Sequence, residues 1–157
     1  MWVLPLDGDR KPTLFLGTPF TEVWSAFSPD GRWIAYQSDE TGRNEVYVRL
    51  YPGPGGKWQV STGGGTTPGW RADGKEFYYR IGSVIMAVPV DLRGEFKAGQ
   101  PHALLTAPAG LNVLANAPTR DGSRFLALQT GAAAATSQLN LSLNWLDDLT
   151  TRTSGQK

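Results

Sequence analysis

The sequence has no cysteine, a single histidine, no long apolar run and almost no net charge. Without cysteine there are no disulfides, thiolate metal ligands or cysteine nucleophiles. No run approaches the about 18 apolar residues of a membrane-spanning helix. The opening MWVLPLDGDRKP lacks the basic and apolar regions of a signal peptide, so we expect none in this chain. Fifteen Lys and Arg against 14 Asp and Glu argue against electrostatic binding of nucleic acid.

Glycine, proline and aromatic residues are abundant instead. The 157 residues include 19 glycines, 11 prolines and six tryptophans, and aromatic residues make up 11%. Many turn residues combined with many aromatic residues are typical of all-β proteins. The length suits one domain with a sizeable core. We therefore predict a single all-β domain.

Three Asp-Gly pairs recur at nearly regular spacing, each between two strand-like runs. An Asp-Gly pair in that setting is a strong β-hairpin signal, because glycine readily adopts the positive φ that the turn requires. A basic residue and an apolar or aromatic run follow each pair. The pairs, 43 and 48 residues apart, are Asp30–Gly31, Asp73–Gly74 and Asp121–Gly122.

Strands before and after each pair complete a repeat of about four strands. In the first repeat, alternation and turn residues predict strands over 33–38, 45–51 and 58–62. The second repeat has the same layout and ends in a strand over 103–106. Four antiparallel strands in about 43 residues are typical of one β-propeller blade.

The predicted organisation is one partial propeller domain over residues 1–149 with about thirteen strands. GAAAAT, at 131–136, is expected to form a flexible hairpin tip within the last blade. The predicted segments are two strands of a partial blade (1–16), a blade (20–62), a second blade (66–106), an incomplete three-stranded blade (111–149) and a disordered tail (150–157).

The stretch FSPDGRWIAYQSD, at 27–39, resembles the repeat of TolB-like propellers, as do Gly42 and EVYV at 45–48. GGKWQVSTGGGTTPGW, at 55–70, and the closing NWLDDL are similar to the propellers of bacterial membrane-anchored serine/threonine kinases. Ala72 and the pair Thr119-Arg120 depart from the repeat pattern without disturbing the turns.

The resemblance implies a six-bladed propeller that binds proteins, peptides or small molecules in a sensory or scaffolding role. The chain has no kinase domain, so kinase activity is not implied. An extracytoplasmic location follows only if the chain belongs to such a sensor kinase.

About three blades amount to half of a six-bladed ring, which leaves two alternatives. In the first, two copies form a homodimer that closes the ring and hides the apolar blade flanks. In the second, the chain is a fragment of a longer propeller, such as the regulatory propeller of a sensor kinase or a peptidase.

Aromatic residues of the predicted strands are expected mainly to pack between blades. This expectation covers Trp24, Phe27, Trp70, Phe77 and Tyr79. A subset, with polar neighbours, is predicted to lie near one ring of positions at the mouth of the central channel, where propellers commonly hold ligands. The candidate ligand-binding residues are Glu22, Trp24, Trp70, Arg71 and Arg120.

No catalytic, metal or cofactor site is predicted. His102 is expected in a surface loop, and no G-x-S-x-G elbow in a strand-to-helix context accompanies it. Asp39, Glu40 and Asn44 lack the spacing of a calcium loop and read as turn residues. Glycan cleavage is disfavoured because it needs paired carboxylates, and Glu22 is the one acidic residue placed near the channel mouth.

Overall fold

The computed structural model describes residues 1–129, and the regular structure in this part of the chain is entirely β-strand. The predicted all-β class is therefore confirmed for these residues. Within them, no helix is long and apolar enough to cross a membrane. The strands are β1 (Trp2–Val3), β2 (Thr13–Leu14), β3 (Glu22–Phe27), β4 (Trp33–Ser38), β5 (Glu45–Leu50), β6 (Lys57–Gln59), β7 (Thr66–Trp70), β8 (Glu76–Ile81), β9 (Val84–Asp91), β10 (Lys97–Ala98), β11 (His102–Thr106), β12 (Leu111–Pro118) and β13 (Phe125–Gln129).

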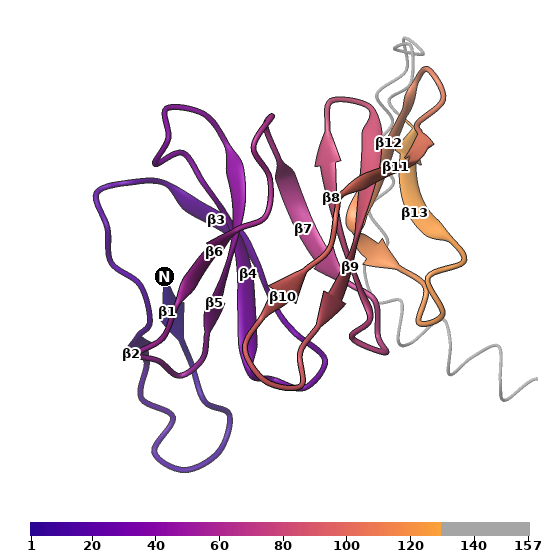
Figure 1. Cartoon of the computed structure of the whole chain (residues 1–157). Helices are drawn as coiled ribbons and strands as arrows, with labels where there is room; N and C mark the ends of the chain where they lie inside the picture. The colour runs from indigo at the N-terminus through magenta and orange to yellow at the C-terminus, as the bar shows by residue number, and fades with distance from the viewer. Residues whose placement is uncertain (130–157) are drawn as a thin grey trace, which may run out of the picture.

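These strands form four antiparallel sheets that follow one another across the molecule (Figure 1). The N-terminal sheet pairs β1 with β2, and the first sheet has the order β3-β4-β5-β6. The second sheet has β7-β8-β9, and both β10 and β11 pair with β9. The third sheet pairs β12 with β13. We call β3, β7 and β12 the leading strands, because each begins its sheet.

Most predicted strands are present, with shifted ends. β4 coincides with the prediction, whereas β6 spans Lys57–Gln59 rather than 58–62. Beyond β6, Val60 N–H still donates to Val46 O at 2.8 Å, and the side chain of Ser61 then accepts the Val46 N–H through Oγ, also at 2.8 Å. β10 was not predicted; it pairs antiparallel with the last residues of β9. The hairpin tip at 131–136, the remainder of the last predicted blade and the tail at 150–157 lie outside the described residues.

Each Asp-Gly pair lies in a hairpin turn with one repeated geometry. The glycines have φ of 70°, 69° and 71° in chain order. The aspartate accepts a backbone N–H two residues later, as Asp30 Oδ1 does from Arg32 at 3.1 Å. Ser28 N–H donates to Trp33 O across the turn, so the loop has four residues and is wider than a two-residue hairpin. The three turns lie at the lower end of the sheets in Figure 1.

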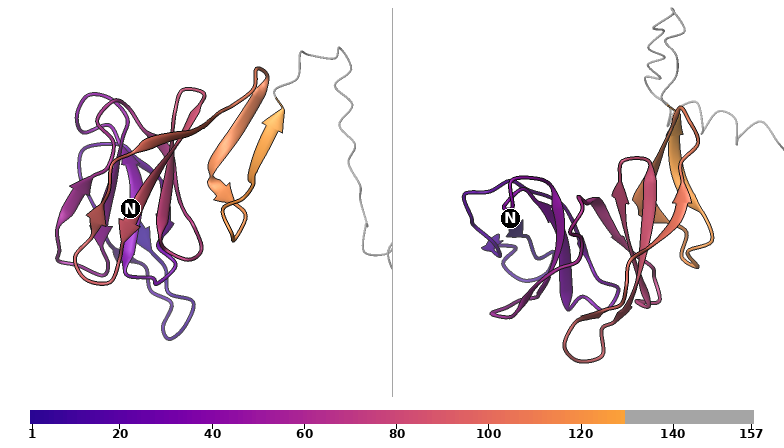
Figure 2. Two further views of the ribbon diagram at one scale, coloured as in Figure 1. Left: turned by 45° about the vertical axis from the view of Figure 1, so that its right-hand side comes forward. Right: turned by 45° about the horizontal axis from the view of Figure 1, so that its top comes forward.

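Alternating side chains of each strand fill the spaces between neighbouring sheets. Trp33 and Ala35 of β4 face the second sheet, where they join Trp70, Phe77 and Val88. A smaller cluster, including Tyr78, Ile85 and Val113, fills the space between the second and third sheets. Tyr36, Tyr47 and Leu16 pack between the first and N-terminal sheets. The sheets therefore pack face to face as a series of layers (Figure 2).

Three expectations about individual residues are wrong. Trp24 and Phe27 were expected between sheets, but 58% and 48% of their surfaces are exposed. A bulge turns Trp24 away from the sheet interface, and the two-residue strands of the N-terminal sheet are too short to cover Phe27. His102 is the first residue of β11 rather than a loop residue, because it pairs with Ala87 of β9.

Candidate functional site

All three leading strands are irregular where they pair with the next strand. The register shifts between Val23 and Ala26 in β3 and between Thr66 and Gly69 in β7. A third shift, between Val113 and Pro118, interrupts β12. Bulges of this kind redirect side chains and are over-represented beside functional sites. We therefore expect a functional site near the middle of the leading strands.

Two residues in these bulges have strained backbones. Trp24 has a φ of 54° and Thr67 a φ of 49°, in the left-handed region that favours glycine. The two positions are equivalent, since each lies six residues before the aspartate of its Asp-Gly turn. The strain is greatest for a β-branched residue such as Thr67, and positions of this kind cluster at functional sites.

A cleft of about 360 Å³ opens at the strained positions. All three leading strands contribute to it, together with neighbouring strands of each sheet, and we call it the leading-strand cleft. Its lining residues are Trp24, Gln37, Thr66, Thr67, Arg80, Asn112, Leu114, Asn116 and Leu128. Figure 1 shows β3, β7 and β12 in their respective sheets.

The polar groups of the cleft are only partly satisfied. Thr67 N–H donates to Gln37 Oε1 at 3.4 Å, and Thr66 Oγ1 donates to Arg80 O at 3.3 Å. Arg80 also donates through Nη1 to Asn112 Oδ1. Thr67 Oγ1 and Arg80 Nε, by contrast, are buried and have no hydrogen-bond partner among the described residues. Buried polar atoms without partners are rare and costly, so a ligand that pairs with them would gain binding energy.

The described residues of the cleft present hydrogen-bonding groups and apolar surface. Amide and hydroxyl groups, one guanidinium and the exposed ring of Trp24 line it. Among residues 1–129, none of those that line the cleft carries a carboxylate or an imidazole. The groups present can hydrogen-bond to neutral polar ligands and pack against an apolar surface.

The structure places the five predicted ligand-binding residues at different locations: near the leading-strand cleft, in the core between the first two sheets and in the Asp-Gly turns. Trp24 lines the leading-strand cleft, and Glu22 lies two residues before it and accepts a hydrogen bond from Thr18 Oγ1. Trp70 is 8% exposed and donates Nε1–H to Ala26 O at 3.2 Å. Arg71 and Arg120 follow their leading strands, in the Asp-Gly turns at the opposite end.

Arg71 already has partners within the second sheet. Its Nη1 lies 3.0 Å from Glu76 Oε2 and its Nε 3.4 Å from Asp73 Oδ2. The hydrogen bond with Glu76, more than any other cause, raises the pKa of Arg71 above its usual value. Arg71 thus stabilises its Asp-Gly turn. The five predicted ligand-binding residues do not form a single ring.

Sequence reasoning missed several cleft residues, including Gln37, Thr67, Arg80 and Asn112. One available signal was the equivalence of Thr67 with Trp24, counted back from each Asp-Gly pair. Arg80 carried no such signal. It lies near the end of β8, and it lines the cleft only because β7, with its bulge, and β12 come together there.

Other polar clusters have structural explanations. Asp39 Oδ1 accepts the Thr21 N–H at 2.9 Å, which lowers the pKa of Asp39, and Glu40 forms an ion pair with Lys57. The fully buried Glu45 accepts hydrogen bonds from Ser61 Oγ and, at 3.0 Å, from Gly64 N–H. Within residues 1–129, no group of three or more His, Asp or Glu side chains is placed to hold a metal ion.

Comparisons with known proteins add no assignment. No protein-family model matches the chain, and no curated protein matches it either.

Proposed function

We propose that this chain is a non-enzymatic, TolB-like β-propeller module that binds peptides, or peptide segments of proteins, in a sensory or scaffolding role. Successive antiparallel sheets, joined by Asp-Gly turns at one end and packed face to face through apolar cores, support the propeller architecture. In a propeller the first strand of each blade lines the central channel. The leading-strand cleft would then open on that channel.

The strained and unsatisfied groups of the cleft are the observation that carries this proposal. Strain at Trp24 and Thr67 costs of the order of 1–3 kcal/mol each, and the buried Thr67 Oγ1 and Arg80 Nε add to that cost. A peptide backbone supplies the alternating acceptors and donors that these atoms lack. The exposed ring of Trp24 offers a surface for one apolar side chain of the peptide.

We also propose that two copies form a homodimer that closes a six-bladed ring. Both ends of the series of sheets carry exposed apolar side chains. Trp2 and Leu14 are 65% and 58% exposed on the N-terminal sheet, and Leu126 is 59% exposed on β13. Apolar faces of this kind mark interaction sites. In a twofold assembly, each N-terminal end packs against the third sheet of the other copy.

Peptide binding can be tested with a pool of N-acetylated, C-amidated tripeptides that carry neutral side chains. We expect saturable changes in the amide resonances of Trp24, Thr67, Arg80 and Asn112 in ¹H–¹⁵N NMR spectra of the full chain. Trp24→Ala should weaken binding about tenfold, because it removes the apolar contact surface.

Ser25→Ala is the matched control, since Ser25 is exposed and lies in the same bulge but does not line the cleft. We expect it to bind the pool as the wild type does. Peptide-induced changes that are absent, or that are identical in the wild type and Trp24→Ala, would contradict peptide binding at this cleft.

A further inference from the structure

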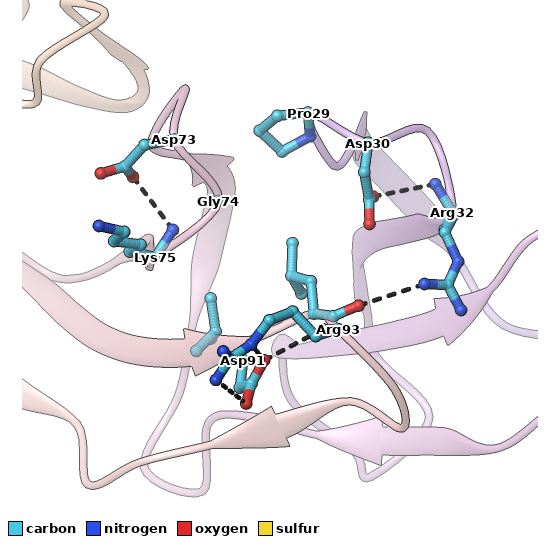
Figure 3. A pocket seen from close by; sticks show the side chains of 10 residues that line it. Pro29, Asp30, Arg32, Asp73, Gly74, Lys75, Asp91 and Arg93 are labelled. Carbon is cyan, nitrogen blue, oxygen red and sulfur yellow. Dashed lines mark hydrogen bonds and ion pairs between the residues drawn. The ribbon is translucent and has the colours of Figure 1, made fainter.

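A second and larger cleft lies at the other end of the sheets, between the first two Asp-Gly turns. Its volume is about 650 Å³, within the range of about 300–1,000 Å³ that is common for small-molecule sites. Residues 29–32 form one wall, residues 73–75 face them, and the end of β9 with the residues after it forms the floor (Figure 3). We call it the turn cleft.

The centre of the turn cleft is apolar and its rim is charged. Pro29, Val90 and Leu92 supply apolar surface, and Gly74 approaches Leu92 so closely that a Cβ on Gly74 would lie 3.2 Å from Leu92 Cδ1. The rim has three carboxylates and three cations, so its net charge is zero. These residues are Asp30, Arg32, Asp73, Lys75, Asp91 and Arg93.

Some of the rim charges already have partners. Arg93 pairs with Asp91 through two contacts of 3.0 Å, one to each carboxylate oxygen. Asp73 Oδ2 lies 3.4 Å from Arg71 Nε. Asp91 is therefore neutralised within the protein, whereas Asp73 shares the guanidinium of Arg71 with Glu76.

Asp30, Arg32 and Lys75 can still form further hydrogen bonds or ion pairs. Asp30 Oδ1 accepts hydrogen bonds from Ser28 Oγ and from Arg32 N–H, but Asp30 Oδ2 has no partner among residues 1–129. Arg32 donates through Nη1 to Leu92 O at 3.4 Å, which holds its guanidinium at the rim without neutralising it. Lys75 Nζ likewise forms no ion pair within the described residues.

We propose that the turn cleft binds a zwitterionic molecule with an apolar body, of the kind exemplified by a short peptide with free termini. Asp30 Oδ2 accepts from the ammonium group, Lys75 on the facing wall binds the carboxylate, and the apolar body between them covers Pro29, Val90 and Leu92. A ligand with only a positive or only a negative charge would pair with the carboxylate or with the cations of the rim, but not with both. A ligand that carries both charges therefore complements this rim better.

The repeat does not by itself create a cleft between neighbouring Asp-Gly turns, as the second and third turns show. Between the second and third turns, Tyr78 and Arg71 occupy the space beside Gly122, where a Cβ would lie 2.6 Å from Tyr78 Oη. The turn cleft is thus a particular feature of the first two turns. It also lies at the end opposite the leading-strand cleft, so this proposal stands apart from the proposed function.

The test is titration of the full chain with the dipeptide leucyl-leucine, followed by ¹H–¹⁵N NMR. We expect saturable shifts of the amides of Gly31, Arg32, Gly74 and Lys75 with a millimolar or lower Kd. N-acetylation or C-amidation of the dipeptide should each weaken binding about tenfold, because each removes one charge-assisted contact.

Matched variants assign each terminus of the ligand to its partner. Asp30→Asn removes the charge but keeps an oxygen that can accept the Arg32 N–H in the turn. In this variant, N-acetylation of the dipeptide should cause no further loss of binding. Lys75→Gln should remove the effect of C-amidation. Asp121→Asn makes the equivalent change to the aspartate of the third turn, and Arg124→Gln removes the basic residue that lies one place later in that turn; we expect both to bind as the wild type does.

Three results would overturn the proposal. They are the absence of saturable shifts at the turn cleft, equal affinity for the free and doubly capped dipeptides, and an unchanged effect of capping in the variants. Shifts confined to Trp24 and Thr67 would place the dipeptide in the leading-strand cleft and would likewise exclude the turn cleft. For every variant, the dispersion of the amide spectrum tests whether the fold is intact.

Discussion

At the scale of single residues, Thr67 combines two costs that seldom occur together. Its backbone lies in the left-handed region, and its buried Oγ1 has no partner among the described residues. Glycine relieves both, because it tolerates positive φ and carries no hydroxyl. We therefore expect Thr67→Gly to raise the free energy of unfolding by about 1 kcal/mol, as measured by urea denaturation.

Ser25→Gly is the control for this substitution. Ser25 is exposed and does not have positive φ, so glycine there should lower the free energy of unfolding by about 0.5–1 kcal/mol. If Thr67→Gly proved as destabilising as Ser25→Gly, Thr67 would not be a strained position.

Asp91 gives a prediction about pH. Its hydrogen bonds with Arg93 lower the pKa of Asp91 from 3.8 to about 2 in the folded chain. A lowered pKa in the folded state means that the ionised carboxylate stabilises the fold above pH 3.8, and that this contribution is lost as the pH falls from 3.8 towards 2. Asp91→Asn should therefore show a shallower loss of stability over that interval, measured by thermal unfolding.

Arg93→Gln tests the cause of this effect. Without the guanidinium the pKa of Asp91 should return towards its ordinary value, so this variant should show the same shallower profile. A steep profile in both variants would mean that other carboxylates, such as Asp121, whose pKa is also lowered, account for the acid sensitivity.

At the scale of elements, the approach of β7 to β12 depends on one glycine. A Cβ on Gly69 would lie 2.5 Å from Asn116 Cα and 2.6 Å from Ala115 O, and these backbone atoms cannot move without separating the second and third sheets. Gly69→Ala should lower the free energy of unfolding by about 2–3 kcal/mol. Urea denaturation measures the loss.

Gly63 supplies the comparison, because nothing lies within 4 Å of a Cβ placed there. We expect Gly63→Ala to change stability by no more than about 0.5 kcal/mol. Similar losses for both variants would show that the two sheets do not pack as closely as described.

The sequence was a good guide to strands and turns because their signals are local. The Asp-Gly pairs located three hairpins, and alternation placed β4 over Trp33–Ser38. The bulges carried no local signal. Strict alternation counted back from Ala26 places Trp24 between the sheets, and the register shift between Val23 and Ala26 breaks that count. The cleft residues of the second and third sheets, such as Arg80 and Asn112, come together only through the packing of sheets distant in sequence.

At the scale of the whole molecule, the exposed apolar ends are the basis of the proposed dimer. Leu126→Glu would place a charge in the proposed contact between the third sheet of one copy and the N-terminal sheet of the other. We expect it to yield a monomer with an intact amide spectrum, because an unpaired buried charge is strongly disfavoured.

Leu104→Glu is the matched control, since Leu104 is 44% exposed on β11, in the second sheet rather than at either end. It should leave the oligomeric state unchanged. Dissociation by both substitutions, or by neither, would argue against the proposed interface.

The solution mass of the full chain tests the central claim of a ring closed by two copies most directly. Static light scattering over a range of concentrations should give a mass near twice 17.0 kDa that does not change with concentration. A mass of 17.0 kDa at every concentration would contradict closure by a second copy, and the apolar ends would then need another partner.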